Sequence, residues 1–206
     1  MIRKFNLIIF IILLSISKAH SLIEIDITRG NLDPLPIAVS PLFQDDKSKK
    51  NSINELKIEN IGSQISTVVE NNLKTSGLFN PLSNEAFLQK PDIAHLKPRF
   101  EDWALIKAQA LITGKVIIEN KKLKVEFRLW DILAGREMMA LAFTTVPSNW
   151  RRVGHIISDK VYERLTGEKG YFDTRIIYVS EEGPKIERVK KLAIMDQDGF
   201  NTKYLT

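Results

Sequence analysis

The sequence predicts an α+β fold, in which a mostly antiparallel sheet is packed by two main amphipathic helices. Three closely spaced strand patterns, with near-perfect alternation in the middle one, indicate an antiparallel meander over residues 110–146. Apolar residues at helical spacing in segments 58–77 and 148–167 predict two helices that cover this sheet. The chain has 206 residues and no cysteine, so a packed core without disulfides must stabilise it.

Short strands are expected ahead of the first helix. Leu22 to Thr28 alternates strictly between aliphatic and polar side chains, which is typical of a strand with one buried face. A turn at residues 30–34 leads to a second strand over residues 35–40. The polar segment 44–54 has no period, so we expect it to be a mobile surface loop.

The first amphipathic helix is expected to end near Gly77, in the left-handed conformation of a C-terminal cap. An irregular, proline-punctuated stretch then runs to Pro98, and a short helix is expected over residues 100–107. Trp103 and Trp150 are interpreted as core anchors. The apolar stripe of the first helix comprises Ile58, Ile61, Ile65, Val68, Val69 and Leu73.

The second helix is expected to begin after Ser148 as its N-cap and to end at Gly167. Residues 167–170 contain two glycines and indicate a flexible joint. Beyond it we expect two short strands, separated from a last extended piece by the turn Asp196–Gly199. The buried stripe of this helix comprises Trp150, Val153, Ile157, Val161 and Leu165.

The first 21 residues have the pattern of a secretory signal peptide. Two basic residues precede a ten-residue apolar run, Leu7 to Ile16, and small residues follow it. A helix of that length spans about 15 Å, too short for a bilayer core of about 30 Å, so no stable membrane anchor is expected. Cleavage is expected after Ser21, with Ala19 as the alternative site and an uncleaved, membrane-anchored N-terminus as the other interpretation. Loss of three basic residues with the leader lowers the formal net charge from +5 to +2, so the basic balance does not indicate nucleic-acid binding.

The sequence contains no persuasive catalytic, cofactor or metal site. The glycines form neither a dinucleotide fingerprint nor a phosphate loop, and no serine lies in the G-x-S-x-G elbow of a hydrolase. His155 has no carboxylate partner at local spacing, so a structural role is favoured over an acid–base role. Asp196 and Asp198 could begin a calcium loop, but the further ligands of such a loop do not follow, and a turn is favoured. We therefore expect a protein that is not an enzyme and binds no cofactor or metal.

Residues 154–179 carry the strongest family signal, the string GHIISDKVYERLTGEKGYFDTRIIYV. Residues 36–43 (PIAVSPLF), the L-x-x-S-G-x-F-N-P pattern of residues 73–81, and the N-terminal strand agree with it in order. Together they closely resemble the TolB family, the periplasmic component of the bacterial Tol–Pal envelope system. The resemblance implies a signal peptide (1–21), an N-terminal α/β domain (22–170) and the start of a six-bladed β-propeller (171–206). Since a blade needs about 40–45 residues, we expect an incomplete first blade and a truncated form of the family.

The resemblance also implies a function through protein–protein contacts, in outer-membrane integrity and cell division. The family binds the inner-membrane partner TolA through its N-terminal strand, which corresponds here to Leu22, Ile23, Glu24, Ile25, Asp26 and Ile27. An alternating strand suits addition to another sheet, although an ordinary edge strand has the same pattern. Pal binding is assigned to the propeller and is doubtful here. The alternative is a truncated fragment with little function or none.

Overall fold

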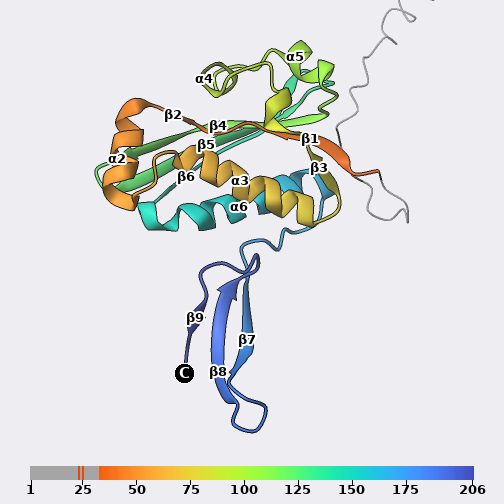
Figure 1. Ribbon diagram of the computed structural model, residues 1–206. Coiled ribbons are helices and arrows are strands. Elements are labelled where there is room, and N and C mark those ends of the chain that lie inside the picture. Colours follow the sequence, from red (N-terminus) through yellow and green to blue (C-terminus); the bar gives the residue numbers. More distant parts are fainter. Residues whose placement is uncertain (1–22, 24, 26–32) are drawn as a thin grey trace, which may run out of the picture.

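The main sheet of the computed structural model has the strand order β3-β1-β4-β5-β6, with β2 beside β4 (Figure 1). The structure describes residues 23, 25 and 33–206. The predicted strand over Leu22–Thr28 lies outside the described residues, apart from Ile23 and Ile25. The strands of this sheet are β1 (Leu35–Val39), β2 (Phe43–Gln44), β3 (Phe79–Pro81), β4 (Ala110–Glu119), β5 (Lys122–Asp131) and β6 (Arg136–Thr145).

Helices cover both faces of the sheet. The two long helices, α3 and α6, lie side by side on one face, and the short helices α4 and α5 lie on the other (Figure 1). The predicted α+β class, with two main amphipathic helices on a sheet, is therefore confirmed. The helices are α2 (Asp46–Leu56), α3 (Ile61–Thr75), α4 (Pro91–Ala94), α5 (Phe100–Leu105) and α6 (Trp150–Thr166), with 3₁₀ turns η1 (Asn84–Ala86) and η2 (Pro147–Asn149).

The sheet is mixed. The meander β4-β5-β6 is antiparallel, as predicted, and supplies its longest pairings. Strand β1 runs parallel to both β3 and β4. The parallel pair β1–β3 was not predicted, because β3 has only three residues and ends at a proline. A segment of three residues is too short for an alternating pattern that would distinguish a strand from a loop.

The main core fills the space between the sheet and helices α3 and α6. The inward side of β5 contributes its alternating residues, which are at most 1% exposed: Leu123, Val125, Phe127 and Leu129. A second cluster around Trp103 and Trp130 packs on the opposite face. Trp103 is a core anchor as predicted, whereas Trp150 is only half-buried at the edge of the main core.

Residues 46–56 form helix α2 and not the expected mobile loop. The Asp45 carboxylate caps this helix by accepting a hydrogen bond from Ser48 N at 2.7 Å. The buried face of α2 consists of two serines, Ser48 and Ser52, and Ser48 Oγ accepts from Ile118 N of β4 at 3.3 Å. Because hydroxyls form the buried face, this helix has no apolar period for sequence analysis to detect.

The ends of the long helices follow the predicted glycines. Gly77 and Gly167 both have φ of 75°, the left-handed conformation expected at helix C-termini. The predicted N-cap of α6 is wrong: Ser148 lies inside η2, and Asn149 occupies the cap position. Pro147 opens a separate 3₁₀ turn, so the α-helix begins one residue later than the serine suggested.

A second, antiparallel sheet follows α6 and consists of β7 (Arg175–Glu182), β8 (Val189–Asp196) and β9 (Lys203–Tyr204). The joint before it is held in place where the sequence suggested flexibility. The Asp159 carboxylate accepts hydrogen bonds from Phe172 N at 2.6 Å and Asp173 N at 3.1 Å. Gly170 packs so closely that a Cβ there would lie 2.4 Å from Asp159 Cα. Only glycine, which has no Cβ, therefore allows the backbone at residue 170 to approach α6 this closely.

Candidate functional site

The C-terminal end of α6 meets the N-terminal segment. Ile25 N donates to Leu165 O at 2.7 Å, which satisfies a carbonyl in the last turn of the helix. Ile23 and Ile25 are half-buried and pack against the main core. Of the residues expected to bind a partner, Ile23 and Ile25 are thus placed, while Leu22, Glu24, Asp26 and Ile27 lie outside the described residues.

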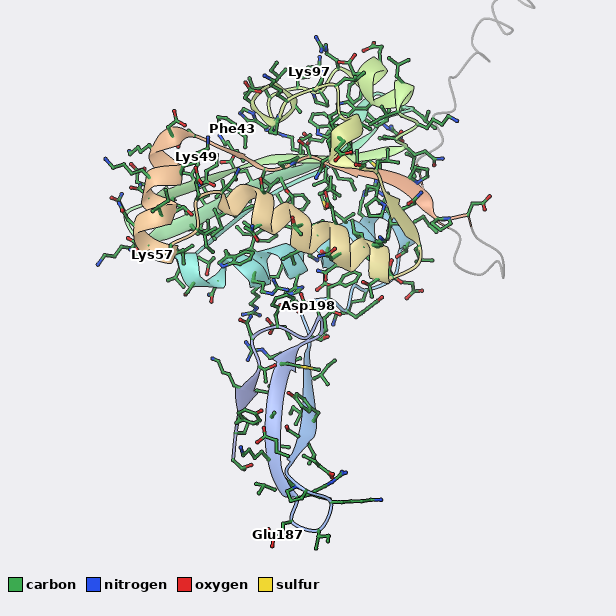
Figure 2. All side chains as sticks on the ribbon, viewed as in Figure 1. Phe43, Lys49, Lys57, Lys97, Glu187 and Asp198 are labelled. Atoms are coloured by element: carbon green, nitrogen blue, oxygen red, sulfur yellow. The ribbon has the colours of Figure 1, made fainter. Side chains whose placement is uncertain are left out.

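The N-terminal half of α6 meets the second sheet in a group of polar side chains that we call the junction cluster. It is drawn from α3, α6 and the turn between β8 and β9, and Figure 2 shows Asp198 between the helical layer and the second sheet. Its members are Asn72, Arg151, His155, Ser158, Asp196, Gln197 and Asp198.

His155 is the centre of the cluster and is only 2% exposed. Its Nδ1 lies 2.9 Å from Asn72 Nδ2, and that amide also donates to Ser158 Oγ at 3.0 Å. Its Nε2 lies 3.6 Å from Asp198 Oδ2 and has no hydrogen-bond partner. Burial lowers the pKa of His155 below its ordinary value of 6.5, against an opposing effect of Asp198, so the ring is neutral at pH 7.

The two aspartates of the turn are held by different partners. Asp198 pairs with Arg151, whose guanidinium carbon lies 3.6 Å from the centre of the Phe200 ring. Asp196 Oδ2 accepts from Asn201 Nδ2 at 2.5 Å. His155 and Asp196 also line a cleft of about 390 Å³ between α6 and the second sheet. The cleft gives solvent access to one side of the cluster.

The proximity of His155 to Asp196 and Asp198 was missed by sequence reasoning. The turn at Asp196–Gly199 was predicted, but the histidine lies more than 40 positions earlier, and no local spacing links them. One ligand atom from each residue lies within 4.8 Å of the others. The cluster can thus hold a proton or a cation, while its hydroxyl, on Ser158, donates to Gly154 O and accepts from Asn72 Nδ2.

Comparison with known proteins places the chain in a family. The sequence profile of the TolB amino-terminal domain matches residues 23–138. The chain belongs to this family. The TolB resemblance of the sequence motifs is thereby confirmed.

A curated relative from Pelagibacter ubique (strain HTCC1062), the Tol-Pal system protein TolB, is 74% identical over 206 residues. This match covers 100% of the chain and 46% of the relative, so the chain spans about half the length of that TolB. The crystal structure of TolB from Acinetobacter baumannii superposes with a TM-score of 0.68 at 23% identity. The superposition covers 84% of this chain and 39% of the Acinetobacter chain, and it shows that the two share a fold.

Over the part of the chain that the structure describes, none of the helices combines the length and the hydropathy needed to cross a bilayer.

Proposed function

We propose that this TolB-family chain is a non-enzymatic adaptor of the Tol–Pal system that acts in the periplasm. It binds a TolA-like partner through Leu22–Ile27, by adding that segment as a strand to the partner's sheet. In this function it contributes to outer-membrane integrity and to constriction during cell division. The family assignment and the name of the Pelagibacter relative, Tol-Pal system protein TolB, support the Tol–Pal part of the proposal.

The alternation of aliphatic and polar residues over Leu22–Ile27 is the observation that carries the binding mode. Within the described part of this segment, Ile25 N donates to Leu165 O at 2.7 Å, and Ile23 and Ile25 are half-buried against the main core. A segment with this pattern can add a strand to the sheet of a partner.

The predicted leader supports the periplasmic location. The basic start, the short apolar run and the small residues before Leu22 are the features of a cleavable leader. The resemblance assigns Pal binding to propeller surfaces beyond the first half-blade, so our proposal for residues 22–206 is limited to the TolA-like partner.

Binding to the periplasmic domain of the TolA-like protein from the same cell tests the proposal. Calorimetry would compare residues 22–206 with a form that lacks residues 22–28 and with an Ile25→Pro variant, which removes the backbone donor. We expect the deletion to abolish measurable binding and the proline to weaken it by roughly tenfold or more, equivalent to about 1.4 kcal/mol.

Glu187→Ala is the matched control, since Glu187 lies at the far tip of the second sheet (Figure 2). This variant should bind with unchanged affinity. Equal binding by the deletion form and the intact segment would contradict the proposal.

A further inference from the structure

His155 Nε2 has an unsatisfied position inside the junction cluster. It is buried without a hydrogen-bond partner, and the nearest carboxylate oxygen, on Asp198, lies 3.6 Å away. That separation is too long for a hydrogen bond, for which N···O distances of about 2.7–3.2 Å are typical. A buried ring nitrogen left without a partner calls for a structural explanation, and an ion bound in front of it provides one.

The same separation is the one expected for two ligands of one metal ion. Zinc lies about 2.1 Å from both imidazole nitrogen and carboxylate oxygen, so two tetrahedral ligands lie roughly 3.4 Å apart. One ligand atom from each of His155, Asp196 and Asp198 falls within 4.8 Å of the other two. The adjoining cleft reaches His155 and Asp196, so water can supply a fourth ligand.

We propose that His155, Asp196 and Asp198 form a binding site for a divalent transition metal ion of the Zn²⁺ type. The ligands come from α6 and from the β8–β9 turn, so a bound ion bridges the helical layer and the second sheet. One imidazole and two carboxylates favour Zn²⁺ over Mg²⁺, which prefers oxygen ligands only and keeps its water shell.

Asn72 can orient the ring for this purpose. A metal on Nε2 requires the proton on Nδ1, and Nδ1 faces the Asn72 amide at 2.9 Å. Reversal of that amide in place presents Oδ1 as the acceptor for Nδ1–H, the arrangement by which ligating histidines are usually held. The Gln197 amide, which donates to Asn72 Oδ1 at 2.9 Å, must then reverse as well, and Asn72 no longer donates to Ser158 Oγ. Asn72 is itself only 2% exposed, so it remains beside the ring in either orientation.

Two arginines compete with the ion. Arg151 pairs with Asp198, and Arg175 Nε lies 3.7 Å from Asp196 Oδ1. Together they balance the two carboxylates, so binding of a cation must weaken at least one of these pairs. Arg175 is the weaker competitor, because its side chain is 66% exposed. Its removal should therefore strengthen metal binding.

Calorimetric titration of Zn²⁺ into the whole chain, prepared without a histidine tag and dialysed against EDTA, tests the site. We expect uptake of one Zn²⁺ per chain, a higher Tm in its presence and no change with Mg²⁺. Asp196→Asn should weaken Zn²⁺ binding by roughly tenfold or more. Arg175→Gln should tighten it by about two- to fivefold, the range of an exposed ion pair.

His95→Gln is the control for the other histidine in the described residues, and it should bind Zn²⁺ as the unaltered chain does. His155→Gln should not bind, but its loss could also reflect misfolding, so Asp196→Asn and Arg175→Gln carry the decision, with folding checked by circular dichroism. Absence of saturable Zn²⁺ uptake by the unaltered chain overturns the proposal. So does undiminished uptake by Asp196→Asn. Neither result bears on binding of the TolA-like partner through Leu22–Ile27.

Discussion

Glu70 shows how burial sets the behaviour of a single side chain. It lies half-buried on α3, and this burial raises the pKa of its carboxyl above the ordinary value of 4.5. Asn84 Nδ2 donates to Glu70 Oε1 at 3.2 Å and opposes part of that shift. The unfolded chain then loses this proton at lower pH than the folded chain. The free energy of unfolding therefore falls as pH rises from about 4.5 through the folded-state pKa.

Glu70→Gln should accordingly stabilise the protein at pH 7. The amide carries no charge to be buried, and its oxygen can still accept from Asn84. We expect a higher urea midpoint at pH 7, with the gain shrinking towards zero below pH 4, where Glu70 is protonated in both states. Urea unfolding at several pH values measures this. Glu55→Gln, at an exposed position of α2, serves as the control and should show no such pH-dependent gain.

At the scale of the element, helix α2 is stabilised by packing of small polar side chains. Ser48 Oγ satisfies Ile118 N of β4, whereas Ser52 is completely buried and its Oγ has no hydrogen-bond partner. The two serines lie four residues apart on one face of the helix. Both are buried serines, but only the Ser48 hydroxyl takes part in a hydrogen bond to the sheet.

Alanine at these two positions should therefore act in opposite directions. Ser52→Ala removes an unsatisfied buried hydroxyl and adds helix propensity, so we expect the free energy of unfolding to rise by about 1 kcal/mol. Ser48→Ala leaves Ile118 N without a partner and should lower it by about 1 kcal/mol or more. Chemical denaturation of both variants measures the two changes. Destabilisation by both substitutions would show that the Ser52 hydroxyl has a role that its surroundings do not explain.

The contrast between α2 and α3 explains how much of the fold was predictable. Helix α3, helix α6 and the β4-β5-β6 meander bury regular apolar stripes, and the sequence alone predicted each of them. Helix α2 buries serines, and β3 is a three-residue strand whose pairing depends on β1, which lies some 40 residues away. In both cases tertiary contacts determine the secondary structure, and local hydrophobic periodicity does not detect such contacts.

The same limit applied to the junction cluster. The turn at Asp196–Gly199 was predicted from local chemistry, and Gly199 has a positive φ of 85°, which suits its glycine. The contact of this turn with His155 depends on the path of the chain between the end of α6 and the start of β7. Asp159 fixes this path by accepting hydrogen bonds from the backbone N–H groups of Phe172 and Asp173. A carboxylate in the middle of a helix has no local sequence pattern that predicts such a role.

At the scale of the whole molecule, the second sheet is attached to the helical layer by the packing of Tyr171 and Phe172 on Tyr162 of α6 and by three sets of polar contacts. They are the bonds of Asp159 to Phe172 N and Asp173 N, the junction cluster, and the exposed ion pair between Arg152 and Asp173. The first is partly buried and involves a charged acceptor, while the ion pair is largely solvated. Hydrogen bonds to charged groups contribute about 1.5–3 kcal/mol, and exposed ion pairs about 1 kcal/mol or less.

Asp159→Asn should therefore loosen the attachment of the second sheet without unfolding the main sheet. The amide of asparagine offers one acceptor oxygen and turns a donor toward the other N–H, so one of the two bonds is lost. We expect hydrogen exchange at Phe172 and Asp173 to accelerate by about tenfold or more and protease cleavage within residues 167–174 to increase, with β4 and β5 unchanged. Asp173→Asn removes only the solvated pair with Arg152 and should leave both readouts nearly as they were. If exchange at residues 172 and 173 stayed slow in Asp159→Asn, the junction cluster and the packing of Phe172 on Tyr162 would be sufficient to hold the two sheets together.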